Sequence, residues 1–75
     1  MHLTGVILNS MRTIAFEIPT MIGQQSRMVV QNALKKIGAM NVKIKARIAE
    51  VTIQDSLKKV DLIIAIEETG NVVKY

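Results

Sequence analysis

The sequence predicts an α+β fold, a two-layer sandwich in which two helices cover one face of a small mixed sheet. Two observations predict it. Apolar and polar residues alternate in 13–18 and 41–48, as in half-buried strands, whereas apolar residues recur every three to four positions in 23–38, as in an amphipathic helix. Because 75 residues leave room for one domain, we assign 1–75 to a single domain with the element order β-α-β-α-β-β.

The first element is expected to be extended over 3–18. Ile14, Phe16 and Ile18 fall on one side of the alternation, which is the face we expect to be buried. An apolar stretch at 6–8 either begins this strand or forms a separate one. Pro19 ends the pairing, because proline has no N–H to give to a neighbouring strand.

The clearest helix is predicted from about Gly23 to Gly38. Its apolar stripe has the spacing i, i+3, i+4 and i+7 and consists of Val30, Ala33, Leu34 and Ile37. Gly38 stands where a glycine commonly takes the left-handed conformation that ends a helix.

The segment 41–48 is predicted to be a strand with Lys43, Lys45 and Arg47 on one face. After Ile48 the alternation changes phase. We favour a helix over 49–60 for two reasons. Ala49 begins a series of apolar residues with helical spacing, and two parallel strands need a crossover between them. The alternative is a longer strand with a β-bulge, since one inserted residue also shifts the phase.

The last elements are predicted from an apolar run and the turn that follows it. Every residue of 62–66 is apolar, which favours a central strand covered on both faces. A turn is expected over 67–71, and 72–73 are expected to return as a short edge strand.

Composition excludes several kinds of chemistry. There is no cysteine, and the only histidine is His2, so we expect no metal site, no cofactor, no catalytic residue and no enzymatic activity. The apolar runs are too short to span a bilayer and the N-terminus lacks a signal-peptide pattern, which favours the cytoplasm.

Charge is distributed unevenly, and it suggests a partner. The net charge is +4, and residues 18–49 carry six cations and no acid. If strand and helix present these cations to one side, they form a groove that binds the phosphate backbone of DNA or RNA without sequence preference. The predicted contact centres on Lys43, Lys45 and Arg47, with Arg27, Lys35 and Lys36 beside them, in a small basic protein that acts as a homodimer.

The alternative function is a self-assembling or protein-interaction module. Residues from 50 to the end carry five acids and three lysines, so the acid-free half of one copy can meet the acidic half of another. Such a module has no role in nucleic-acid binding.

Two short motifs resemble the Alba family of small nucleic-acid-binding proteins. The first is Ile22-Gly23-Gln24-Gln25 before the helix, and the second is Val42-Lys43-Ile44-Lys45-Ala46-Arg47 after it. The resemblance implies that Lys45 and Arg47 contact nucleic acid. It also places Gln24 and Gln25 where the family carries paired lysines, so that they keep hydrogen bonding and lose charge.

Overall fold

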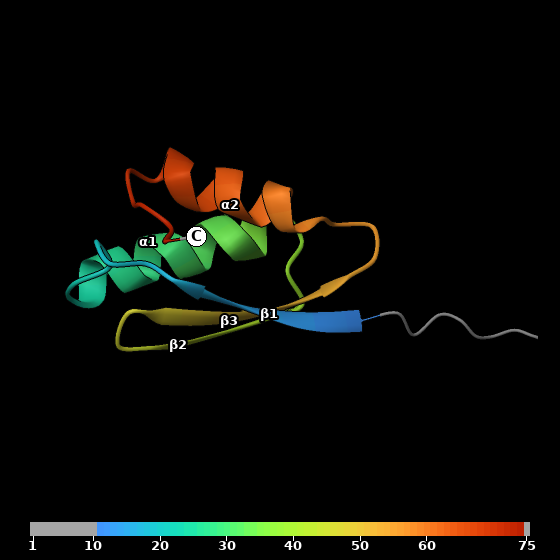
Figure 1. The fold of residues 1–75 in the computed structure, drawn as a ribbon, viewed down its shortest axis with the longest axis horizontal. Helices are drawn as coiled ribbons and strands as arrows, with labels where there is room; N and C mark the ends of the chain where they lie inside the picture. The colour runs from blue at the N-terminus through green and yellow to red at the C-terminus, as the bar shows by residue number, and fades with distance from the viewer. Residues whose placement is uncertain (1–10, 75) are drawn as a thin grey trace, which may run out of the picture.

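The computed structural model describes residues 11–74 and shows a two-layer α+β sandwich, which confirms the predicted fold class (Figure 1). A three-stranded sheet in the order β1-β3-β2 is covered on one face by two helices. In the part of the chain that is described, both strand pairs are antiparallel, so the sheet is not mixed. The elements are β1 (Met11–Glu17), α1 (Gln24–Lys36), β2 (Asn41–Lys45), β3 (Ile48–Gln54) and α2 (Lys59–Glu68).

The first strand and first helix lie where the sequence predicts them. β1 covers the later part of the expected segment 3–18, while the prediction for 6–8 falls outside the described residues. Gly23 precedes α1 with φ +92°, and Gly38 follows it with φ +109°. Both values lie in the left-handed region that glycine tolerates best, so the two glycines delimit the helix.

The predicted strand 41–48 is in fact a strand and a turn, and the helix predicted over 49–60 is wrong. β2 ends at Lys45, Ala46 and Arg47 form the turn, and β3 returns antiparallel beside β2. Val42 faces Val51 and Ile44 faces Ala49, so the buried positions are even-numbered in β2 and odd-numbered in β3. The phase change therefore marks a two-residue hairpin turn, and neither a bulge nor a helix.

The predicted strand at 62–66 is also wrong, because these residues lie within α2. A short run of apolar residues does not distinguish a buried strand from a buried helix. Asp61 favours the helix locally, since its carboxylate accepts a hydrogen bond of 2.9 Å from the backbone N–H of Lys58 at the N-terminal end. The helix continues to Glu68, so the turn predicted over 67–71 starts later.

The edge strand predicted at 72–73 is wrong, because these two residues belong to no strand and only the next residue makes an isolated bridge. Lys74 pairs with Glu17 at the end of β1, where its backbone N–H donates to the Glu17 carbonyl oxygen at 2.8 Å. Val73 is buried and belongs to the hydrophobic core. The last described residue therefore lies beside the end of β1, the first strand.

The core lies between the sheet and the helical layer. Phe16 of β1 and Val51 and Ile53 of β3 face the helices, and Leu34 of α1 and Ile66 of α2 pack onto them. The other face of the sheet is open to solvent. No helix of the described part is long and apolar enough to cross a membrane.

Candidate functional site

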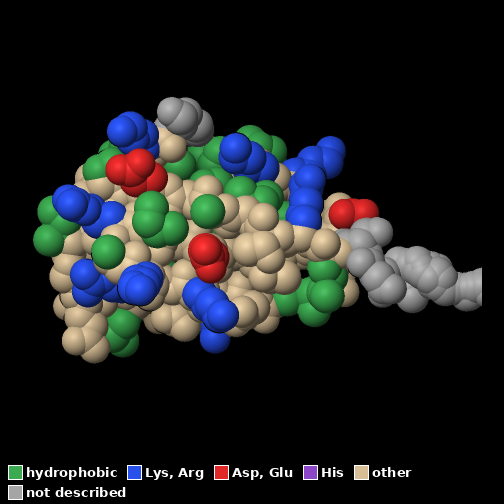
Figure 2. All heavy atoms as spheres, turned by 60° about the horizontal axis from the view of Figure 1, so that its bottom comes forward, with side chains coloured by type: hydrophobic (Ala, Val, Ile, Leu, Met, Phe, Trp, Pro, Cys, Tyr) green, Lys and Arg blue, Asp and Glu red, His purple; other side chains and the backbone are tan. Residues whose placement is uncertain are grey.

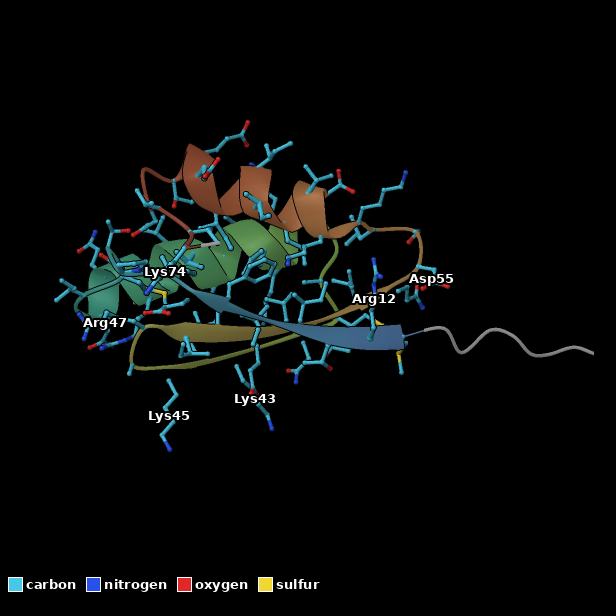
Figure 3. All side chains as sticks on the ribbon, in the orientation of Figure 1. Arg12, Lys43, Lys45, Arg47, Asp55 and Lys74 are labelled. Carbon is cyan, nitrogen blue, oxygen red and sulfur yellow. The ribbon has the colours of Figure 1, made fainter. Side chains whose placement is uncertain are left out.

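The three strand cations predicted to form one row lie on two different sides of the molecule. Lys43 and Lys45 point away from the helices, on the open face of the sheet, whereas Arg47 lies beside the beginning of α1 (Figure 3). The reason is the turn, because Arg47 is not a strand residue and does not continue the alternation of β2.

The remaining predicted contacts belong to the helical layer. Arg27 is in the second turn of α1, and Lys35 and Lys36 are in its last turn. Eight residues separate Arg27 from Lys35, which is about 12 Å along a helix axis. Gln24 and Gln25 open α1 with exposed side chains. The eight predicted residues therefore do not form one groove.

Acidic side chains are interspersed among the cations of the open face. Glu50 of β3 lies directly opposite Lys43 of β2 in the strand register. At the edge of the sheet, Lys74 Nζ lies 4.0 Å from a carboxylate oxygen of Glu17. Figure 2 shows red side chains between the blue ones on this side of the molecule. This mixed pattern gives no continuous track for a phosphate backbone.

Three segments meet at the end of the molecule where α1 begins, and two hydrogen bonds join them. The backbone N–H of Ile18, after β1, donates to the carbonyl oxygen of Arg47 at 2.8 Å. Arg27 Nε of α1 donates to the carbonyl oxygen of Ala46 at 3.2 Å. The loop after β1, the hairpin turn and the start of α1 are therefore held together.

A hollow of about 350 Å³ opens at this junction, and we call it the loop-end hollow. None of its five lining residues is acidic, and two are arginines from different elements. Ile22 at its rim is 70% exposed, the largest exposure of any large apolar side chain in the described part. The lining residues are Met21, Ile22, Arg27, Ala46 and Arg47.

The helix that begins at the loop-end hollow adds to its positive potential. Within α1 the first turn contains no acidic residue, and no side chain caps it. The free N–H groups of a first helical turn carry a partial positive charge. This charge has the same sign as that of Arg27 and Arg47.

Comparisons with known proteins give one match, to a solved structure. It is the solution structure of a protein of Bacillus anthracis strain Ames that is assigned as copper-ion-binding. The likeness has a TM-score of 0.80 and 23% sequence identity, and covers 88% of this chain and 99% of the other. No protein-family model and no curated protein matches the chain. At this identity the likeness shows the fold.

Two predictions from the sequence are corrected here. The resemblance to the Alba family is wrong, because the fold matches that of the Bacillus anthracis protein. The prediction of a nucleic-acid-binding homodimer, with DNA or RNA as partner, is also wrong. The structural match points away from it, and the turn at Ala46 and Arg47 separates the cations that it required.

The sequence does not predict the loop-end hollow. Ile22 stands out only as part of a short motif, and the alternation over 41–48 predicts that Arg47 lies on a strand. One signal was present, since the phase change at Ile48 marks the hairpin turn. The contact between that turn and Arg27 depends on tertiary packing, which no local pattern reveals.

Proposed function

Copper binding is assigned to the Bacillus anthracis protein, and the described residues of this chain offer neither a thiolate nor an imidazole ligand for such an ion. Sulfur ligands select Cu(I), and imidazoles suit copper generally. The chain has no cysteine, and its single histidine, His2, lies outside the described residues. Within 11–74, no group of three His, Cys, Asp or Glu side chains is placed to hold a metal ion. Met21 is fully buried and shares its hollow with two guanidinium groups. A copper ion bound by 11–74 would have methionine thioethers as its only soft ligands, which is a poor fit for a copper site.

We propose that this chain is a docking domain for an acidic polypeptide segment, which it binds in the loop-end hollow without a metal ion. The observation that carries the proposal is that Arg27 and Arg47, from separate elements, line one hollow with the exposed Ile22 and no acid. Guanidinium groups pair with carboxylates through parallel hydrogen bonds, and arginine is enriched among the residues that dominate binding energy.

The exposed isoleucine distinguishes a polypeptide from a simple anion. An anion gains nothing from contact with Ile22, whereas a segment with an apolar residue next to its acids buries that side chain. The hollow is also preorganised, because hydrogen bonds already fix Arg27 to Ala46 and the turn to Ile18. Preorganisation lowers the entropic cost of binding.

The loop after β1 is fixed on its other side as well. Thr20 Oγ1 donates to Asn71 Oδ1 at 2.9 Å and accepts a hydrogen bond of the same length from the backbone N–H of Val72. The segment that carries Ile22 is thus tied to the C-terminal part of the chain as well as to the hairpin turn. Both sides of the loop-end hollow are therefore supported by contacts from distant parts of the sequence.

The test is fluorescence anisotropy with a labelled peptide in which glutamates flank two leucines. We expect saturable binding that weakens as salt is added, and a loss of about fivefold to tenfold in affinity for Arg47→Gln and for Ile22→Gln. A peptide with glycines in place of the leucines is expected to bind more weakly. Equal binding of the two peptides would show that bulk charge alone is responsible.

The matched control is Lys36→Gln, which removes an exposed cation at the far end of α1. It lowers the net charge as much as Arg47→Gln does. If both variants lose the same affinity, the loop-end hollow is not the binding site and the proposal fails.

A further inference from the structure

Helix α2 presents apolar side chains on its solvent side as well as toward the core. Leu62 and Ile66 are fully buried, as expected for a helix that packs on a sheet. Val60 and Ile64, however, are 53% and 49% exposed, and they are four residues apart on one face. A surface helix ordinarily carries polar residues there. This second apolar face has no partner within the described residues.

The exposed face of α2 continues into a groove between the two helices. Two adjoining hollows of about 350 and 390 Å³ share Ile37, the residue that follows α1, and Ala65 and Glu68 of α2. We call this groove the helix seam. Its lining includes two acids and one cation, together with small and apolar side chains: Asp61, Glu68, Lys36, Ala33, Ile37, Ile64 and Ala65. Ile37 and Ile64 give it an exposed apolar centre.

The charges around the helix seam favour a cationic partner. Asp61 and Glu68 line it from the first and last turns of α2. The last turn of α2 contains two glutamates and no basic residue. Carboxylates there repel the negative end of the helix dipole, which costs stability. A cation bound beside Glu68 would offset that cost.

We propose that the helix seam binds a basic amphipathic helix of a partner protein. Two helices side by side form a groove that accepts the apolar stripe of a third helix. Asp61 and Glu68 are seven residues apart, which is about 10.5 Å along α2. A partner helix aligned with α2 matches them with two cations that are also seven residues apart.

Lys36 sets the orientation of the bound helix. It lies on the α1 side of the helix seam, opposite the acids of α2. The partner therefore turns its cations toward α2 and its apolar residues onto Ile37 and Ile64. This surface is separate from the loop-end hollow and takes a ligand of the opposite charge.

The test uses a labelled helical peptide of about 18 residues, long enough to form a helix in water. It has a leucine stripe and lysines seven positions apart. We expect saturable binding to the wild-type chain, about tenfold weaker for Ile64→Gln and about threefold weaker for Glu68→Gln. Glu68 is the better choice over Asp61, because the Asp61 carboxylate also stabilises the end of α2. No binding to the wild-type chain would overturn the proposal.

The matched control is Met28→Gln, which replaces a side chain that is 53% exposed on α1 away from the helix seam. The Met28→Gln variant is expected to bind the peptide as the wild type does, and all variants are expected to be fully folded at the temperature of the binding measurement. A scrambled peptide that binds equally well would overturn the proposal.

Sedimentation of the chain alone tests whether a second copy of the chain occupies the helix seam. A dimer that Ile64→Gln dissociates would show that the helix seam holds a second copy, which also overturns the proposal. Variants of Arg47 are expected to leave binding of the basic peptide unchanged, so failure here is distinguishable from failure of the acidic-segment proposal.

Discussion

Arg27 Nε donates a hydrogen bond of 3.2 Å to the carbonyl oxygen of Ala46, nineteen residues further along the chain. The bond joins the helical layer to the turn of the β2–β3 hairpin. Ala46 has φ +55°, a left-handed conformation that residues other than glycine adopt at a cost. The loop-end hollow is therefore built on a turn that the local sequence does not favour.

Replacing Ala46 with glycine is expected to stabilise the chain. The left-handed conformation costs an alanine about 1–2 kcal/mol, while the greater freedom of glycine in the unfolded chain offsets about 0.4–1 kcal/mol of that gain. We expect Ala46→Gly to raise the free energy of unfolding by about 0.5–1 kcal/mol, measured by urea denaturation.

The control for this prediction is Ala33→Gly within α1, where the backbone is helical. Glycine in a helix interior costs about 1 kcal/mol, so this variant should change stability in the opposite direction. A loss of stability in both variants would mean that the conformation of Ala46 is not strained.

Local patterns predict the elements well where they are periodic. The apolar stripe of α1 and its two flanking glycines give the helix nearly at its observed bounds. The hairpin turn is harder to predict, because Ala46 and Arg47 are not turn-forming residues and the alternation continues through them. For 62–66 a uniformly apolar run carries no period, so tertiary packing decides between helix and strand.

The candidate site is less predictable than the fold. Lys43 and Arg47 share a face only if 41–48 is one strand, and the turn places them on different sides. The contact of Arg27 with the turn arises when α1 packs over the sheet, and nothing in the spacing of these residues indicates it. The exposure of Ile64 likewise follows from the orientation of a helix that the sequence did not predict.

Substitutions at two isoleucines of α2 test the orientation of this helix on the core. Ile66 is fully buried and Ile64 is about half exposed, although both belong to the same apolar run. We expect Ile66→Ala to cost about 2–5 kcal/mol of unfolding free energy and Ile64→Ala less than about 1 kcal/mol. The milder Ile66→Val, at about 0.5–1.5 kcal/mol, keeps the comparison measurable if Ile66→Ala does not fold. Equal losses for the two alanine variants would contradict the assigned orientation of α2.

Asp61 is expected to stabilise the beginning of α2. Its carboxylate accepts a hydrogen bond of 2.9 Å from the Lys58 N–H, which has no partner within the helix. Asp61→Ala removes this acceptor and a favourable charge at the helix N-terminus, so we expect a loss of about 1 kcal/mol. Thermal unfolding followed by circular dichroism measures it. Asp55→Ala, which removes an exposed acid from the loop before α2, is the control and should have little effect.

Copper is expected to leave the stability of the chain unchanged. A ligand that binds only the folded state at one hundred times its dissociation constant stabilises a protein by about 2.7 kcal/mol. Residues 11–74 offer no cysteine or histidine, so Cu(I) added under reducing conditions should not shift the unfolding midpoint. His2 lies outside this range, and His2→Gln therefore serves as the control. A saturable rise in the midpoint that persists in His2→Gln would show that the chain holds copper without His2, and it would contradict the proposal that this chain binds its partner without a metal ion.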